Sequence, residues 1–340
     1  MSFYAPAKLA IAAVAGVAFL VTSQPSSALE DFKMRVDWAP YNLHAPYHYA
    51  VQEGWFKDVG LNVKVDDGNG SVVTIQMTGA GAYDVGHANL GAMAAGVAKG
   101  ASVKAVGGII RKNDMGAIVD ASLDIKSMKD IVDRGYKLIT TPGGFDTPFM
   151  KAIFTAAGAD PKKVKFMNVA ASAKLSSYLT KKGEAVSSTP PYFAPIVEKK
   201  RPSNYIYYVD YGLQIPGFGL VASTDTIKDR PEVLRKYLSV MSRAWKQAWS
   251  GPDAVKAMVA AMKAQRPQAK INEVWELQRF VNYAPFSQTE NTKGKGILYQ
   301  SEADWSKAVA DMEGAGIFPK GKFTATDFFT NEFLPAGGSS

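Results

Sequence analysis

The residues with the clearest chemical potential stand together after the first strand-like run of the chain. That run ends at Asp37-Trp38-Ala39-Pro40, and rings and hydrogen-bonding side chains follow at once: Tyr41, Asn42, His44, Tyr47 and His48. Such a group at the carboxyl end of a first strand is where an open α/β sheet places its ligand. Its residue types indicate a binding site for a molecule with a flat body and polar groups. An ordinary core position is the alternative for Trp38, but Pro40 and the polar residues after it favour a site.

The histidines raise the question of a metal. The chain has three, and His44 and His48 are four residues apart, so both can lie on one helix face at a spacing used by metal sites. The residues between them offer no carboxylate, and the chain has no cysteine. We therefore predict no metal and no other cofactor. His44 is expected to form a neutral hydrogen-bonding wall of the ligand site, and His48 to have a structural role.

Strand-like and helical stretches alternate along the first two thirds of the chain. The strand-like runs are 32–37, 61–65, 83–87, 103–109, 116–119, 137–141, 163–169, 184–188, 205–209 and 219–222. Helical stretches at 45–53, 71–79, 89–99, 147–157, 171–182 and 191–199 lie between most of them. This alternation predicts an α/β protein with mostly parallel sheets that helices cover on both faces.

The remaining third is predicted to be helical. Asp229 is expected to cap a helix that has Pro231 in its first turn and Glu232 at capping-box spacing. Asn272 is expected to cap a further helix that stops before Pro285, and residues 303–314 give another.

Residues 33–65 also have a characteristic order of elements. A strand is followed by the Trp38-Ala39-Pro40 turn, a helix closing on Gly54-Trp55-Phe56, and a strand that begins at Gly60-Leu61. This order resembles the opening of periplasmic substrate-binding proteins of ABC importers, of the nitrate, sulfonate, taurine and thiamine-precursor type. The resemblance implies a two-lobed, type II-like fold with a hinge between the lobes. It places lobe 1 in residues 29–115 plus 216–340, and lobe 2 in residues 120–210.

The resemblance also implies roles for individual residues. Trp38 would stack on the ligand or wall it, and Asp37 or Asn42 would supply a hydrogen bond. A turn at Gly68-Asn69-Gly70-Ser71 would line one side of the cleft, and the turn Thr140–Thr147 would face it from the other lobe. Asn69, Gly70 and Ser71 are the candidates in the first turn, and Gly143, Gly144, Phe145 and Thr147 in the second. A plain glycine turn with a serine cap is the alternative for the first.

Two further turns complete the predicted site. Asn89 either caps the helix that follows it or touches the ligand. Thr189 and Tyr192 follow the strand-like run 184–188, where thiamine-precursor binders of this type often carry an acidic residue. In this chain hydroxyl groups stand in place of that acidic residue, which favours a ligand with acceptor oxygens. Arg111 is the nearest cation that the sequence places beside the cleft.

The first residues predict export. Lys8 is followed by thirteen uncharged residues, and Ser26 and Ala28 stand at the −3 and −1 positions of a signal-peptidase site. We predict a signal peptide over 1–28, cleaved after about Ala28, and a soluble periplasmic protein. Thirteen residues span only about 20 Å, too little for a membrane anchor. The net charge of +8 comes from dispersed lysines and arginines, which predicts no nucleic-acid partner.

Together these features predict a binding protein and not an enzyme. The expected function is to capture a small organic anion, an aromatic carboxylate or a sulfonate, and to deliver it to an inner-membrane ABC permease, with the protein acting as a monomer. An uncharged heterocycle such as a thiamine pyrimidine precursor is the alternative ligand. A thiamine-pyrimidine-synthase-like enzyme is the alternative of a different class.

Overall fold

The structure is a computed structural model that describes residues 1–5 and 28–335. The predicted signal peptide therefore lies almost wholly outside the described residues. Within the described ranges, no helix combines the length and the apolar character needed to cross a membrane.

Two five-stranded sheets form the centre of the molecule. Sheet A has the order β2-β1-β3-β10-β4, and sheet B has the order β7-β6-β8-β5-β9. Sheet A consists of β1 (Glu30–Arg35), β2 (Leu61–Asp66), β3 (Val85–Asn89), β4 (Val103–Gly108) and β10 (Phe218–Ser223). Sheet B consists of β5 (Gly116–Asp120), β6 (Lys137–Thr140), β7 (Lys165–Asn168), β8 (Ala185–Ser188) and β9 (Ser203–Tyr207). The predicted α/β class is confirmed.

Each sheet contains one strand that opposes the others. β10 pairs antiparallel with β3 and with β4, and β5 pairs antiparallel with β8 and with β9. Both strands enter their sheet directly from the other sheet, through segments 109–115 and 208–217. These segments contain no long crossover helix, and a parallel connection usually needs one. The chain therefore crosses twice between the sheets, and the predicted motion of two lobes about these crossings stays a prediction.

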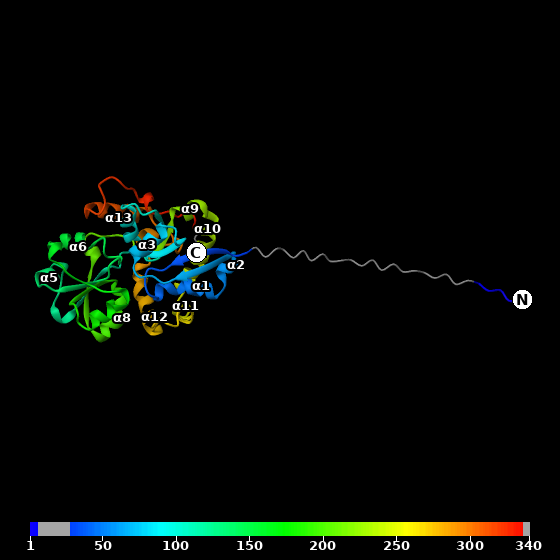
Figure 1. Cartoon of the computed structure of the whole chain (residues 1–340), viewed down its shortest axis with the longest axis horizontal. Coiled ribbons are helices and arrows are strands. Elements are labelled where there is room, and N and C mark those ends of the chain that lie inside the picture. The colour runs from blue at the N-terminus through cyan, green and yellow to red at the C-terminus, as the bar shows by residue number, and fades with distance from the viewer. Residues whose placement is uncertain (6–27, 336–340) are drawn as a thin grey trace.

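The helices cover the two sheets separately (Figure 1). On the sheet A side lie α1 (Ala45–Gln52), α2 (Trp55–Asp58), α3 (Ser71–Gly79), α4 (Leu90–Val97), α9 (Thr224–Asp229), α10 (Pro231–Ala248) and α11 (Pro252–Gln265). On the sheet B side lie α5 (Met128–Asp133), α6 (Met150–Ala156), α7 (Lys174–Leu179) and α8 (Pro190–Lys200). α12 (Glu273–Tyr283) packs on α8 and so bridges the two sides, and α13 (Glu302–Gly314) is the last helix of more than one turn in the described residues.

The buried face of α10 anchors this helix to sheet A. The Tyr237 ring stacks on Phe32 of β1 with centroids 4.5 Å apart, and on Phe56 of α2 at 5.5 Å. Leu238 and Trp245 are fully buried on the same face. Buried aromatic pairs contribute about 0.5–1.5 kcal/mol beyond the area they bury, so this stack fixes β1 against the helical layer.

The helix caps were only partly predictable. Asn272 caps α12 as expected, because its side chain accepts a hydrogen bond from the Trp275 amide at 3.1 Å. The prediction for Asp229 is wrong. Asp229 is the last residue of α9, and α10 follows after Arg230 without a side-chain cap. The capping-box pattern placed Asp229 in a loop before the helix, but residues 224–229 form a short helix of their own.

Candidate functional site

A cavity of about 560 Å³ lies between the two sheets. This volume is within the range of small-molecule sites. Sheet A contributes the turn after β1 together with Phe218, and α12 adds a wall from the C-terminal third. Sheet B contributes Phe145, α7 and α8. The residues that line it include Asp37, Trp38, Tyr41, Phe145, Lys174, Ser188, Thr189, Tyr192, Phe218, Trp275, Glu276, Arg279 and Tyr283.

Asp37 occupies the floor of this cavity and is almost fully buried. His44 Nε2 lies 2.9 Å from Asp37 Oδ1, and Ser71 Oγ donates to Asp37 Oδ2 at 3.2 Å. Burial raises the pKa of Asp37 to about 6, against the lowering influence of His87 and of the Ser71 hydrogen bond. Burial also lowers the pKa of His44 well below its usual value, so this ring is neutral. His44 thus holds Asp37 in place, and it is not itself part of the cavity lining.

Lys174 places a cation in the opposite wall. The residue is 3% exposed, and its Nζ lies 5.7 Å from the Trp38 ring centroid and 5.8 Å from that of Phe145. Burial lowers the pKa of its ammonium group, and Asp146 counters this from outside ion-pair distance. Among the described residues, none forms an ion pair or hydrogen bond with Nζ that would neutralise it. Lys174 therefore presents an unneutralised charge to the cavity between two rings.

A buried ion pair links the third wall to both sheets. Arg279 Nη1 donates to Glu276 Oε1, and Arg279 Nε donates to the Tyr192 carbonyl at 2.7 Å. The guanidinium lies 3.9 Å from the centroid of the Tyr192 ring. Glu276 Oε2 accepts from the Asn42 amide at 2.9 Å. These contacts fix the orientation of Tyr192 and leave Glu276 with little charge to offer a ligand.

The two glycine turns that were predicted to line the cleft meet each other. The Val72 amide donates to the Gly143 carbonyl at 3.2 Å, and Gly70 lies so close that a Cβ there would be 2.4 Å from the same oxygen. Gly70 has φ +149°, a conformation that favours glycine. The turns therefore form a contact between the sheet A and sheet B sides. Because they fill this space themselves, Gly70, Gly143 and Gly144 do not line the cavity.

The predicted site residues thus divide into two groups. Asp37, Trp38, Phe145, Thr189 and Tyr192 line the cavity. Asn69 is exposed and accepts from Arg35, Ser71 binds Asp37, Asn89 caps α4 through a 2.9 Å bond from the Ala92 amide, and Thr147 is exposed. Asn42 is buried and reaches Glu276 through its backbone only. Ligand contact by members of either group stays a prediction.

Sequence reasoning identified Asp37 but missed the other charged residues of the lining. Lys174, Glu276, Arg279 and Tyr283 come from helices far from the first strand, and no local motif marked them. Arg111, which the sequence placed beside the cleft, points elsewhere. Its Nη2 donates to the Gly296 carbonyl at 2.9 Å, and the residue lines a separate small pocket together with Asp304 and Trp305 of α13. Lys174 begins a helix directly after the turn that follows β7. Its position near the carboxyl end of that strand is the sequence signal that could have indicated it as a site residue.

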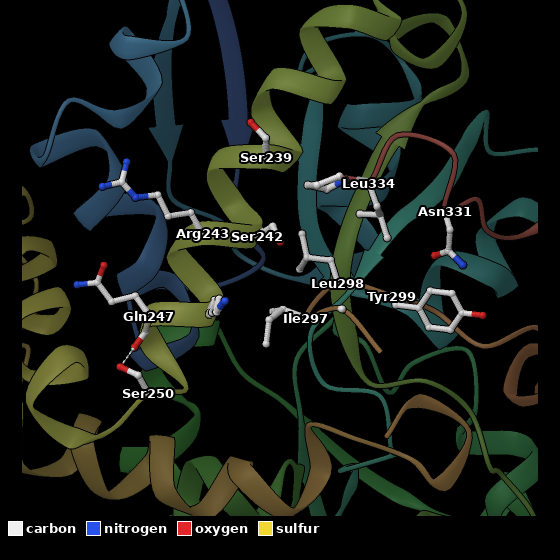
Figure 2. Close-up of a pocket in the computed structure, with 13 residues that line it drawn as sticks. Ser239, Ser242, Arg243, Gln247, Ser250, Ile297, Leu298, Tyr299, Asn331 and Leu334 are labelled. Carbon is white, nitrogen blue, oxygen red and sulfur yellow. Dashed lines mark hydrogen bonds between the residues drawn. The ribbon is translucent and has the colours of Figure 1, made fainter. Parts of the chain in front are cut away.

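A larger depression of about 850 Å³ lies on the outer side of α10 (Figure 2). Ser239, Ser242 and Arg243 of α10 line it together with Leu298 and Leu334. The Arg243 guanidinium lies 3.7 Å from the centroid of the Trp55 ring, so it serves packing. No residue of sheet B or its helices lines this depression. Its residues therefore supply controls for variants of the cavity.

The crossing segments carry one more unusual group. Asp114 is fully buried, and neither of its carboxylate oxygens has a hydrogen-bond partner among the described residues. Burial raises its pKa to about 8, with a further contribution from Asp37. Its neighbour Asn113 donates to the Leu213 carbonyl at 2.6 Å and so joins the two crossings. Asp114 is thus largely protonated at neutral pH.

Comparison with known proteins gives consistent results. The profile of the family described as NMT1/THI5 like matches residues 42–255. The formylaminopyrimidine-binding protein of Halalkalibacterium halodurans is 23% identical over 236 residues, which is 68% of this chain and 70% of that protein.

Two solved structures share the fold. One is the alkanesulfonate-binding protein SsuA from Xanthomonas axonopodis pv. citri, bound to MOPS, with a TM-score of 0.65 at 10% sequence identity. The superposition covers 89% of this chain and 99% of the SsuA chain. The periplasmic nitrate-binding protein NrtA from Synechocystis PCC 6803 has a TM-score of 0.65 at 14% identity, with 90% and 87% covered. The predicted resemblance to binding proteins of this type is confirmed.

Gly70→Ala should destabilise the protein through the contact between the turns. The added Cβ meets the Gly143 carbonyl, so we expect a loss of about 1–3 kcal/mol in unfolding free energy, typical of overpacking. The matched control is Gly251→Ala, because Gly251 also precedes a helix, has φ +150°, and has open space around it. Urea denaturation measures both. Equal losses in the two variants would show that only backbone strain matters.

Asp114→Asn should stabilise the protein increasingly as pH rises. The folded pKa of Asp114, about 8, is above the unfolded value of about 3.9, so its stabilising protonation is complete below pH 4 and is lost as pH rises towards 8. Asparagine does not titrate, so the difference between variant and wild type should grow with pH, approaching about 1.4 kcal/mol per pH unit. Denaturation at pH 5, 6, 7 and 8 measures it. Asp253→Asn, at an exposed aspartate, is the control. A difference that is constant with pH would contradict the burial argument.

Proposed function

The chain belongs to the NMT1/THI5-like family, and on this premise we propose that it is the solute-binding component of an ABC-type importer and captures a small organic anion with a flat body. An aromatic carboxylate or an aromatic sulfonate is the ligand class. The cavity between the sheets would hold it, with the anionic group at Lys174 and the ring at Trp38 and Tyr192.

The observation that carries this proposal is the unneutralised charge of Lys174. Its ammonium is buried between two rings and faces a cavity, and a buried charge without a partner is costly. A carboxylate or sulfonate beside it would remove that cost and would restore the pKa of Lys174. The other ionisable residues of the lining offer less to an anion, since Arg279 pairs with Glu276, Asp37 is itself acidic and is held by His44 and Ser71, and Lys270 is exposed to solvent.

The aromatic lining supports a flat ligand body. Trp38, Tyr41, Phe145, Tyr192 and Trp275 all contribute to the cavity. Tyr41 and Tyr192 pack edge to face at 5.3 Å, and the Arg279 guanidinium fixes Tyr192 from behind. Rings held in this way lose little entropy when a ligand stacks on them, which favours binding.

An uncharged heterocycle is the second candidate. Asp37 lines the cavity, and its carboxylate can accept hydrogen bonds from ring or amino N–H groups. A relative is named as a formylaminopyrimidine-binding protein, which also favours this class. Lys174 can form no ion pair with such a ligand, so it decides our preference for the anion.

The proposal includes the setting in which the protein works. A periplasmic location, delivery to an inner-membrane permease, a monomeric state and the absence of catalysis follow from the importer role. The family and the solved structures of binding proteins support this role. Unchanged ligand after prolonged incubation with the protein would support binding without turnover.

Lys174→Met should selectively weaken binding of anions. Methionine keeps much of the apolar stem but removes the charge. We therefore expect benzoate or benzenesulfonate to bind about 10- to 100-fold more weakly, which corresponds to the loss of one hydrogen bond to a charged group. Benzamide, an uncharged analogue of benzoate, should be unaffected. Calorimetric titration measures both. Equal losses for benzoate and benzamide, or no loss for either anion, would refute the role of Lys174. Arg243→Met in the outer depression is the control.

Trp38→Ala should weaken charged and uncharged ligands alike. Stacking on an aromatic ring contributes about 0.5–1.5 kcal/mol beyond buried area, so an affinity loss of at least about 2- to 10-fold is expected for benzoate and for benzamide. The same calorimetric titration checks this result. Unchanged affinity in both cases would show that Trp38 packs only against Lys174 and not on the ligand.

A further inference from the structure

Three potential metal ligands converge beneath the cavity. Asp37, His44 and His87 each offer one ligand atom, and these atoms lie within 4.8 Å of one another. All three side chains are buried. They come from different elements, since Asp37 follows β1, His44 precedes α1 and His87 lies in β3. The histidine spacing in the sequence pointed to His44 with His48, but His48 turns away and contacts Gln265 Oε1 at 3.1 Å.

The distances between the potential ligand atoms are close to those of a metal site. His44 Nε2 lies 2.9 Å from Asp37 Oδ1, and His87 Nε2 lies 3.8 Å from the same oxygen, too far for a hydrogen bond. The two imidazole rings are 5.2 Å apart at an interplanar angle of 83°. Ligands at about 2.0–2.2 Å from a tetrahedral zinc ion lie about 3.3 Å from one another, so the two separations from Asp37 are each within about 0.5 Å of that value, and all three atoms lie within 4.8 Å.

Two ring nitrogens in this cluster, His44 Nδ1 and His87 Nε2, are buried without a hydrogen-bond partner among the described residues, and the second faces Asp37. A buried polar atom that is left unpaired costs about 1–3 kcal/mol. A neutral imidazole nitrogen with a free lone pair is the form that binds metals.

The surroundings of the cluster resemble an outer ligand shell. The Tyr47 hydroxyl contacts His87 Nδ1 at 2.7 Å, and Ser71 Oγ donates to Asp37 Oδ2. Metal-bound histidines and carboxylates are usually held by such contacts, which orient the ring and select its tautomer. The orientation of His87 is also fixed by stacking on Phe218 at 5.6 Å.

The cluster is adjacent to the ligand cavity. Asp37 belongs to both, and Tyr41 and Phe218, which contact the two histidine rings, also line the cavity. A metal held by three protein ligands keeps a fourth position for water or substrate, as in zinc sites that are not purely structural. Here that position would open towards the cavity.

We propose that Asp37, His44 and His87 form a binding site for a divalent transition-metal ion, with zinc as the preferred class. Two imidazoles and one carboxylate suit zinc and its neighbours better than magnesium or calcium. The site requires no organic ligand, so it goes beyond the proposed importer function. If an organic anion binds as well, one of its oxygens can occupy the fourth position.

Cobalt(II) is the probe for this site, because a tetrahedral cobalt ion with nitrogen and oxygen ligands absorbs strongly in the visible range. The purified protein is first treated with a chelator and then titrated without any organic ligand. We expect one equivalent of cobalt to produce tetrahedral absorption bands, one equivalent of zinc to remove them, and zinc to raise the melting temperature. The absence of these bands, or bands that zinc does not displace, would overturn the proposal. The contact between Asp37 and His44 would then be a hydrogen bond only, with no role in binding a metal.

Two variants test which residues bind the ion. His87→Gln should abolish the cobalt bands, whereas His48→Gln, on the neighbouring helix, should keep them. Tyr47→Phe removes only a hydroxyl, and it should weaken zinc binding about 10- to 100-fold while leaving the fold intact. Bands that persist in His87→Gln, or unchanged zinc affinity in Tyr47→Phe, would contradict the assignment. Cobalt binding is measured without organic ligand. A negative cobalt result therefore does not bear on the benzoate titrations, and a negative benzoate titration does not bear on the metal site.

Discussion

The buried carboxylate of Asp37 is the interaction on which the rest of the site depends. Burying a charged carboxylate without partners is costly, and the chain brings donors to this one. His44 comes from the start of α1, and Ser71 comes from the first turn of α3. Ser71 Oγ also accepts from the Asn89 amide at 3.1 Å, which ties the end of β3 to the same point. One side chain thus fixes how four elements meet at the edge of sheet A, and Trp38 is positioned as a consequence.

The sequence predicted those features of the fold that depend on local patterns. Alternating strand and helix signals located both sheets, and Asn272 marked a helix start because capping involves neighbours only three residues away. The antiparallel direction of β5 and β10 was not predictable, since it arises from how the chain crosses between sheets. The Asp229 pattern failed because a short preceding helix used the same residues.

The same distinction explains the site. Asp37 and Trp38 were found because one strand and its turn place them. Lys174 and Arg279 lie more than 130 residues further along the chain, and only tertiary packing brings them to Trp38 and Tyr192. The glycine turns were located correctly as neighbours across the two sheets, but they touch each other. A sequence pattern indicates that a turn can approach something closely, and it does not indicate what that partner is.

The place of β10 in sheet A has a consequence for how the protein folds. β4 joins sheet A only through β10, because the strand order runs β3-β10-β4. During synthesis the segment 218–223 emerges only after all of sheet B. Until then β3 and β4 have free edges, which are sites for pairing with other chains. Contacts of such long range make folding slow and expose intermediates to aggregation. A chain of this topology therefore benefits from remaining unfolded, or bound to a chaperone, until the segment 218–223 is available.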